Sequence, residues 1–512
     1  MSTSTPQAPE QTLSPAQLIA LGLNHHQSGR FAEAKETYLK VLATEPENFD
    51  ALHLLGVLAL QVGKLEIAVE LIEKAVKQNP ANAVAFNNLG EAYKGQKRYD
   101  QAERCYRLAL ELKADFVEVY SNLGNALKDQ GRLADAVEVY RKALAIKPDF
   151  VLVHYNLGNV LKELCEFEDA EAAFTEVLTL KPDHADAAVN LAVLQLLRGD
   201  YPEGKAFFAH SFEAFRDSSV TRWRAVYQAL QGKRRWQGEP LEGKRLLLVD
   251  EPGAGDNIMM LRYLPLLRKM GPERITLYAT PHLGRLVQAM ECVDEIVPMT
   301  QPVPLQGFDF FAPMMSLPAA AGTTLDTVPR EVPYLRVPGE IMVQAESQLA
   351  GLTGVRVGLV WGVGRLSPTY QRRSIPLDQF GPLRDVAEVQ LVSLQKGKDA
   401  DQRSEIGWDI FDCMADCRDF LDTAGLIDQL DLVISVDTSV AHLAGALGKP
   451  VWLLNCFESE WRWMLEREDS PWYPTLRIFR QKSRGDWAGV IEEVVEELGK
   501  FVKKKKAAGP TV

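Results

Sequence analysis

The sequence has 512 residues, a length that corresponds to about three domains at roughly 150 residues each. Hydrophobic residues make up 46% of the chain and charged residues 25%, a composition that excludes a mostly disordered, collagenous or disulfide-stapled protein. The formal net charge of −12 argues against a general affinity for nucleic-acid phosphates.

The cysteines, the two ends of the chain and its apolar segments bear on the cellular compartment of the protein. Residues 1–14 have neither the basic region nor the apolar core of a secretory leader, and no apolar run reaches the roughly 20 residues of a membrane span. The six cysteines are scattered, and Cys413 and Cys417 lack partner ligands nearby for a metal ion. We therefore expect a cytoplasmic protein without a metal site, with a disordered tail over 1–14 and a basic tail over 501–512.

A repeat of 34 residues organises the N-terminal part of the chain. Leucine–glycine pairs recur at Leu21-Gly22, Leu55-Gly56, Leu89-Gly90, Leu123-Gly124 and Leu157-Gly158. Sixteen residues after these glycines lie the large side chains Tyr38, Ile72, Tyr106, Tyr140 and Phe174. This spacing resembles the tetratricopeptide repeat, whose small residues let two antiparallel helices approach while the large residue fills the space between them. We predict an α-solenoid of six units over residues 15–218, the last unit degenerate.

A series of asparagines accompanies the repeat. Two residues before the glycine position, or its equivalent, lie Asn88, Asn122, Asn156 and Asn190. An amide offers both a donor and an acceptor, so four of them at one spacing form a ladder able to hold a peptide backbone. The segment 122–128 is similar to the superhelix of nucleocytoplasmic O-linked N-acetylglucosamine transferases, and that resemblance implies a ladder that holds the acceptor polypeptide. The alternative is that these amides are common repeat residues facing water.

After residue 219 the repeat ends, and strand-like and helix-like segments alternate. Strands are predicted over 244–250, 355–361, 389–394, 431–436 and 450–454, and a helix over 258–267. The turn 251–256 carries glycines between a strand and a helix, where backbone N–H groups face an anion or a reacting group. The alternation predicts two parallel-sheet lobes, over 219–350 and 351–500, with ligands at the carboxyl ends of the strands.

Three motifs together resemble one glycosyltransferase family. They are Glu251…Gly255-Asp256, Arg373-Ser-Ile-Pro-Leu377 and Ser435-Val-Asp-Thr-Ser-Val-Ala-His442. They are similar to the ADP-heptose–lipopolysaccharide heptosyltransferases, and residues 245–487 are similar to bacterial tetratricopeptide proteins whose C-terminal half is such a transferase. The resemblance implies a GT-B fold of two Rossmann-like lobes. It also implies an inverting, metal-independent transfer, without a cofactor, from a nucleotide sugar bound between the lobes.

The resemblance also implies roles for single residues. Asp256 matches the candidate general base, which removes the proton of the acceptor hydroxyl as that oxygen attacks the anomeric carbon. The alternative is that Asp256 only caps the helix it precedes. The donor-binding residues implied or suggested in this way are Gly255, Lys396, Asp437, Thr438, Ser439 and His442. The alternatives are N-capping plus a core histidine for the motif, and a solvated loop lysine for Lys396.

One loop departs from the family pattern. Residues 362–370 replace a segment rich in Gly, Asn, His and Asp, so the donor is not specified by the resemblance. Arg365, Arg372 and Arg373 still offer positive charge for a phosphate or an acidic sugar. Four aromatic residues follow further along the chain, at Trp461, Trp463, Trp472 and Tyr473. They either shield a base or sugar, or pack between the lobes.

These observations predict a glycosyltransferase that moves a sugar from a nucleotide sugar to a polypeptide acceptor on the repeat arm. Analogy with tetratricopeptide transferases that glycosylate flagellin points to a flagellar or cell-surface subunit. One alternative is a heptosyltransferase-like enzyme acting on a lipid-linked or lipopolysaccharide sugar. The other is a catalytically inactive scaffold that binds nucleotide or a partner. No nucleic-acid partner is expected.

Overall fold

The computed structural model describes residues 13–210, 212–213, 216, 220–364 and 371–508. The chain divides into two compact units, Met1–Ala187 and Ala188–Val512. Among the described residues, none of the helices combines the length and the apolarity that a membrane crossing needs.

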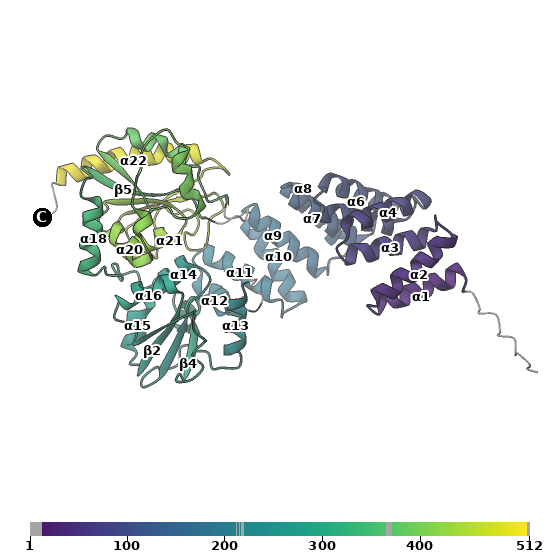
Figure 1. Ribbon diagram of the computed structural model, residues 1–512, viewed down its shortest axis with the longest axis horizontal. Helices are drawn as coiled ribbons and strands as arrows, with labels where there is room; N and C mark the ends of the chain where they lie inside the picture. Colours follow the sequence, from purple (N-terminus) through teal and green to yellow (C-terminus); the bar gives the residue numbers. More distant parts are fainter. Residues whose placement is uncertain (1–12, 211, 214–215, 217–219, 365–370, 509–512) are drawn as a thin grey trace, which may run out of the picture. The chain divides into compact units, whose positions relative to one another are not determined.

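The first unit is a series of antiparallel helix pairs, coloured purple to blue in Figure 1. The helices are α1 (Pro15–Gln27), α2 (Phe31–Thr44), α3 (Phe49–Gln61), α4 (Leu65–Gln78), α5 (Ala83–Gly95), α6 (Tyr99–Leu112), α7 (Val117–Asp129), α8 (Leu133–Ile146), α9 (Val151–Glu163) and α10 (Phe167–Leu180). A sixth pair, α11 (Ala185–Leu197) and α12 (Tyr201–Ala209), continues the spacing, and the boundary between the units falls inside α11.

The glycine of each repeat is in contact with the large residue of the same repeat. A Cβ atom added to Gly124 would lie 2.4 Å from Cε1 of Tyr140, and one added to Gly90 would lie 2.5 Å from the same atom of Tyr106. Both tyrosine side chains are completely buried. The small–large spacing in the sequence is therefore the spacing that brings the two helices of a pair together.

The turn between the two helices of each pair also has a fixed backbone. Residues with a left-handed φ recur every 34 positions, at Gly29, Gly63, Lys97, Gly131, Cys165 and Gly199. Glycine adopts this conformation without steric cost, whereas Lys97 and Cys165 adopt it at φ values of 60° and 64°. The repeat geometry therefore overrides local preference in the third and fifth units.

The second unit contains two parallel sheets. The first has the order β3-β2-β1-β4, and its strands are β1 (Arg245–Val249), β2 (Arg274–Ala279), β3 (Glu295–Pro298) and β4 (Phe310–Pro313). Its helices are α13 (Thr221–Leu230), α14 (Ala254–Met260), α15 (Leu264–Lys269), α16 (Pro281–Gln288) and α17 (Leu317–Ala320), with 3₁₀ turns at Leu261–Tyr263 and Met314–Ser316. Leu247 of β1 pairs with Thr276 of β2 on one side and Phe311 of β4 on the other.

The second sheet has the order β10-β9-β8-β5-β6-β7. Its strands are β5 (Val355–Val360), β6 (Val389–Ser393), β7 (Phe411–Asp412), β8 (Leu432–Val436), β9 (Val451–Asn455) and β10 (Leu476–Arg480). The helices around it are α18 (Gly339–Leu349), α20 (Phe420–Asp428), α21 (Ser439–Ala446) and α22 (Trp487–Ala508), with 3₁₀ segments at Leu377–Asp385, Lys398–Ser404 and Met414–Asp416. Helix α22 buries Val494 and Leu498 in the same core as Leu359 and Ile434 of the sheet.

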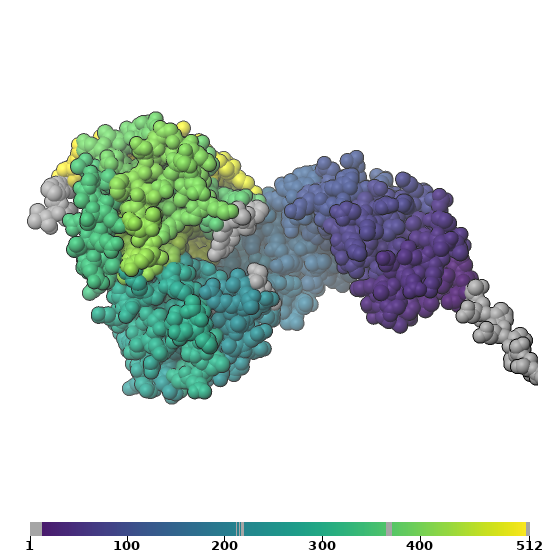
Figure 2. Space-filling model, in the orientation of Figure 1, coloured from purple at the N-terminus to yellow at the C-terminus, as the bar shows by residue number. Residues whose placement is uncertain are grey.

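In both sheets the order in which the chain adds strands reverses at one point. In the first sheet the chain leaves β1 on one side and returns as β4 on the other; in the second it leaves β5 and returns as β8. At such a point the loops after the two neighbouring strands run in opposite directions and leave a crevice at the carboxyl ends of the strands. Ligands of doubly wound folds bind in this crevice. The two lobes meet along the boundary of teal and green atoms in Figure 2.

We predict that Gly124→Ala destabilises the first unit by about 1–3 kcal/mol, because the new methyl group overlaps the ring of Tyr140. Gly499→Ala is the matched control: it lies in helix α22, and nothing is within 4 Å of its added Cβ atom. There the same change should stabilise by about 0.5–1 kcal/mol through helix propensity. Denaturant unfolding followed by circular dichroism measures both, and equal stabilisation would contradict the packing argument.

Candidate active site

A cavity of about 540 Å³ lies at the carboxyl ends of the strands of the second unit. The loops after β1, β5, β6 and β8 all contribute to its wall, as the two strand orders require. The residues of the predicted catalytic and donor-binding set that line it are Gly255, Asp256, Lys396, Asp437, Thr438, Ser439 and His442. The structure therefore brings all seven together, although they come from segments nearly 190 positions apart in the sequence.

Asp256 lies in the first turn of α14, and its side chain is half-buried. The sequence pattern places the start of this helix at residue 258, whereas the helix begins at Ala254, so Asp256 is inside it and Gly253 is the N-cap residue. The Asp256 carboxylate makes an ion pair with Arg462, a residue of the loop after β9. Helix capping is therefore not what this carboxylate does.

The turn that carries Asp256 lies directly against helix α21. A Cβ atom added to Gly255 would be 2.8 Å from Cδ2 of His442 and 3.4 Å from Cα of Ser439. Any larger residue at this position would push the turn away from α21. Gly255 therefore contributes to the site by letting two backbones approach, rather than by a side-chain contact.

His442 is buried among aromatic side chains. Its Nδ1 atom is 2.9 Å from the hydroxyl of Tyr473, and its ring stacks on Trp463 with centroids 5.2 Å apart. Burial, together with the charges of Arg462 and Arg262, holds the pKa of His442 well below its ordinary value. His442 thus combines the two roles the sequence leaves open, because it lines the cavity and is also a hydrogen-bonded core residue.

The loop after β8 places three polar residues at the start of α21. Asp437 is buried and pairs with Arg373 at 3.0 Å. Burial raises the pKa of the Asp437 carboxyl, and the Arg373 guanidinium opposes that shift. Thr438 is the N-cap residue, but its side chain does not cap the helix. Its hydroxyl oxygen lies 3.1 Å from the hydroxyl oxygen of Ser435 instead. The cavity therefore meets a helix start that no N-cap side chain covers.

Charged side chains form a continuous chain along one end of the cavity. Arg462 binds both Asp256 and Glu460, and Arg373 binds both Glu460 and Asp437. Burial disfavours the charged form of Arg462, but Asp256, Glu460 and Asp437 outweigh this cost, so the pKa of Arg462 is raised. Sequence analysis misses Arg462 and Glu460. The available signal is an arginine between two tryptophans, because a charged residue in an apolar segment needs buried partners.

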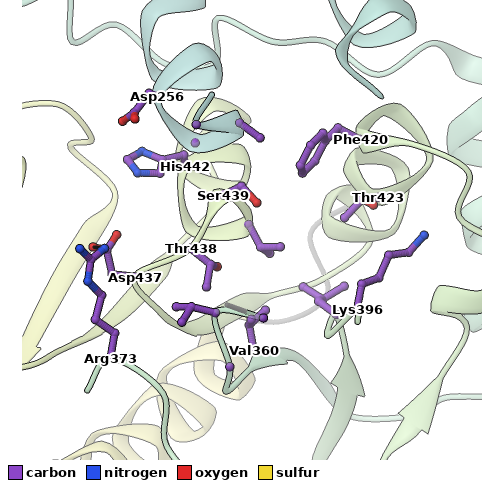
Figure 3. Close-up of a pocket in the computed structure, with 18 of the residues that line it drawn as sticks. Asp256, Val360, Arg373, Lys396, Phe420, Thr423, Asp437, Thr438, Ser439 and His442 are labelled. Carbon is purple, nitrogen blue, oxygen red and sulfur yellow. Dashed lines mark hydrogen bonds and ion pairs between the residues drawn. The ribbon is translucent and has the colours of Figure 1, made fainter. Parts of the chain in front are cut away.

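The other end of the cavity contains Lys396, whose side chain Figure 3 shows across the cavity from Arg373, near Phe420 and Thr423. The Lys396 ammonium donates a hydrogen bond to the carbonyl oxygen of Cys417. The neighbouring Gln395 is buried and fixes the loop after β5, since its Oε1 accepts from the backbone N–H of Gly362 at 2.9 Å. Lys396 is exposed, as expected of a solvated loop lysine, but its amine has a partner within the protein.

The aromatic residues of the 461–473 segment pack in the interior. Trp461, Trp463, Trp472 and Tyr473 are at most 2% exposed, and none is among the residues that line the cavity. Their role in the described structure is packing, not shielding of a ligand. Of the arginines noted in the departing loop, Arg365 lies outside the described residues.

The predicted asparagine ladder makes contacts between neighbouring repeats. Nδ2 of Asn88 is 2.9 Å from Nε2 of His53, and Nδ2 of Asn122 donates to Oδ1 of Asn87 at 3.0 Å. Asn156 is half-buried at the same position of the next repeat. Asn190 belongs to the second unit, whereas the other three lie in the first. Two of the amides therefore have a structural role, and Oδ1 of Asn88 also accepts from Nδ2 of Asn87 at 3.5 Å.

Asp250, at the start of the loop that leads to Asp256, is a fully buried carboxyl group. Its Oδ2 atom accepts hydrogen bonds from the backbone N–H and the hydroxyl of Thr280, at 2.7 and 2.9 Å. Its Oδ1 atom has no partner among the described residues. Burial raises the pKa of Asp250 to about 7, against the two hydrogen bonds from Thr280.

The raised pKa makes stability depend on pH. Between about pH 4 and pH 7 the unfolded chain releases this proton while the folded chain keeps it, so the free energy of unfolding falls as pH rises, by up to about 1.4 kcal/mol per unit. Asp250→Asn removes the titration, so its stability relative to the wild type should increase from pH 5 to pH 8 in urea unfolding. Asp309→Asn is the control, because the pKa of this carboxyl is lowered and titrates below that window. A difference that stays constant with pH would contradict the assignment.

Comparisons with known proteins support the repeat assignment. Family profiles described as tetratricopeptide repeats match residues 19–83, 83–116, 124–164 and 166–230. The chain is 28% identical over 294 residues to Protein FlbA of Caulobacter vibrioides, and the match covers 52% of this chain and 48% of FlbA. It is 30% identical over 84 residues to human Tetratricopeptide repeat protein 7A, covering 16% of this chain and 10% of that protein.

Solved structures that match part of the chain include MamA and pilF of Pseudomonas aeruginosa. MamA is 26% identical, with 32% of this chain and 97% of MamA covered and a TM-score of 0.31. For pilF the identity is 23%, the coverage 42% and 96%, and the TM-score 0.37. The chain spans about half the length of FlbA. Tetratricopeptide repeats therefore make up the N-terminal part of the chain, followed by the region of parallel sheets and helices.

Proposed function

We propose that this chain is a glycosyltransferase that moves a sugar from a nucleotide sugar to a polypeptide bound by the repeat arm. The observation that carries the proposal is the meeting of Asp256 and the Asp437–Ser439 helix start in one cavity between two parallel sheets. Each element comes from the carboxyl ends of a different sheet, which is the arrangement expected of a GT-B enzyme.

The proposed chemistry needs a base and an anion-binding site within reach of one sugar. Asp256 removes the proton of the acceptor hydroxyl as that oxygen attacks the anomeric carbon from the face opposite the leaving group. The start of α21 and the cavity arginines stabilise the negative charge that develops on the departing diphosphate. Independence from metal ions remains a prediction of the family resemblance, and a cytoplasmic location remains a prediction from the cysteines and the apolar pattern of the sequence.

The repeat arm supports a polypeptide acceptor. Tetratricopeptide arrays form extended surfaces that bind protein partners. The amides of Asn88 and Asn122 lie at one position of consecutive repeats. An amide oxygen has two lone pairs, so each can accept a backbone N–H group, at Asn88 in addition to the 3.5 Å hydrogen bond from Asn87. A lipid-linked or lipopolysaccharide acceptor requires no such surface. A catalytically inactive scaffold requires no carboxylate at the position of Asp256.

We predict that Asp256→Asn slows release of nucleotide from a nucleotide sugar by roughly 10²–10⁴ without weakening nucleotide binding. The measurement is product formation from a panel of nucleotide sugars, with calorimetry for binding. Asp469→Asn is the control, since this carboxylate is 72% exposed and lies outside the cavity. Normal turnover in the Asp256 variant would reject the base assignment, and absence of turnover with every nucleotide sugar in the wild type would favour the scaffold.

We predict that replacing Asn88, Asn122, Asn156 and Asn190 together with Ala weakens transfer to the polypeptide acceptor but not hydrolysis of the donor. Each lost backbone contact should cost about 0.5–1.5 kcal/mol of acceptor binding. The test compares intact-mass gain of co-expressed partner proteins with donor hydrolysis by the purified chain.

The control for the arm changes two exposed amides elsewhere on it, Gln27→Ala and Gln78→Ala. Because two of the four asparagines bridge repeats, helical circular dichroism must show an intact arm before the rates are compared. Unchanged transfer in a folded quadruple variant would remove the ladder from the acceptor site and favour a lipid-linked or lipopolysaccharide acceptor.

A further inference from the structure

Glu460 is a carboxylate held between two arginines inside the cavity. Its Oε2 atom is 2.7 Å from Nη1 of Arg462, and its Oε1 atom makes an ion pair with Nη2 of Arg373. The two arginine side chains are 11% and 16% exposed, and that of Glu460 is 28% exposed. All three line the same cavity as Asp256 and Asp437. Each oxygen of this carboxylate is thus committed to a different guanidinium group.

The backbone of Glu460 is fixed, whereas its side chain is the part exposed to the cavity. Its carbonyl oxygen accepts from the N–H groups of Trp463 and Met464, at 2.9 and 3.1 Å. The preceding Ser459 donates to the carbonyl oxygen of Met464 at 2.7 Å and accepts from Asn455. Rotation about the side-chain bonds of Glu460 therefore suffices to remove its carboxylate from the arginines, without movement of the loop.

A phosphate group presents to arginine the same pair of oxygens as a carboxylate. Guanidinium groups bind either anion through two parallel hydrogen bonds, and phosphate carries the larger charge. The start of α21, which follows Asp437 in the chain, has no N-cap side chain on its amides and adds a partial positive charge. The position of the Glu460 carboxylate therefore has the chemistry of a phosphate site.

We infer that Arg373 and Arg462 form the diphosphate-binding clamp of this site, and that Glu460 is a built-in competitor that the diphosphate of the ligand displaces. The inference rests on the proposed function, since it names the part of the nucleotide sugar that these residues recognise. It assigns roles to Arg462 and Glu460, which the family motifs do not include. It also adds Arg373 to the donor site, on the side of the cavity opposite Lys396 (Figure 3).

The competitor makes the clamp selective. An anion of a single charge gains no more from the two arginines than Glu460 already supplies, whereas a diphosphate offers more charge and more oxygen atoms. Arg462 also binds Asp256, so a diphosphate that draws Arg462 toward itself weakens the hold on the candidate base. Recognition of the donor and release of the base are coupled through one side chain.

The test measures binding and requires no knowledge of the sugar. Titration calorimetry with inorganic pyrophosphate, ADP, GDP and UDP compares the full-length wild type with Glu460→Gln and Arg462→Met. We expect Glu460→Gln to bind at least one of these ligands about fivefold or more tightly than the wild type, a typical coupling between competing groups. Arg462→Met should bind it about tenfold or more weakly.

The matched control is Glu458→Gln. Glu458 lies two residues away in the same loop, pairs with Arg372 and Arg484, and is outside the cavity lining. The Glu458→Gln substitution removes the same charge from the protein as Glu460→Gln. A general electrostatic effect would therefore tighten binding equally in both variants, and that result would overturn the inference. Thermal unfolding checks each variant. If Glu460→Gln does not fold, Glu460→Asp, whose shorter side chain retracts from the arginines, should show the same tightening.

The outcomes separate the inference from the proposed function. Nucleoside diphosphate binding that is equal in the wild type and in Glu460→Gln would overturn the inference and leave the proposed function standing. Tightened binding of pyrophosphate, without binding of any nucleoside diphosphate, would support the clamp and count against a nucleotide-sugar donor. Binding of none of the ligands by any variant would overturn the inference.

Discussion

The close approach of Gly255 to His442 is the contact on which the candidate site depends. It places the first turn of α14 against the first turns of α21, so that a carboxylate from one sheet and a donor motif from the other face one cavity. The distance leaves no room for a side chain at residue 255, and the histidine is locked by Tyr473 and Trp463. The geometry of the site is therefore set by backbone packing between the lobes before any ligand contributes.

The segment after β9 connects this contact to the rest of the second unit. Trp461 packs on Phe207 and Phe208 of α12, with ring centroids 5.6 and 5.3 Å away, and the next residue, Arg462, reaches Asp256. From the first lobe, the fully buried Arg262 donates to the carbonyl oxygen of Trp472 in the same segment. Helix α12 of the repeat series is thus part of the same packed unit as the cavity. The residue that packs on this helix, Trp461, is directly followed by the residue that binds the candidate base.

The sequence predicts the features that depend on local spacing, and misses those that depend on distant partners. The 34-residue period follows from the Gly124–Tyr140 type of contact, which recurs within each repeat and is therefore visible in one chain. The strand before Asp256 is predicted within one residue of its observed bounds at each end, because a buried parallel strand is a continuous apolar run. The helix start is misplaced, since Ala254 and Gly255 give no apolar periodicity. Arg462 is missed because its partner Asp256 is 206 positions away.

The proposed donor is an anion, whereas the protein has a net charge of −12, and the buried arginines bear on this conflict. The protein's overall field repels a nucleotide sugar at long range, so attraction must come from cations concentrated in the cavity. Two arginines buried side by side without partners would destabilise the fold, since each loses its hydration. Asp256, Glu460 and Asp437 supply that compensation, and Glu460 occupies the position from which one phosphate group can reach both arginines, because it alone pairs with both. The carboxylates that stabilise the folded site are thus the groups with which the phosphate of the proposed donor has to compete.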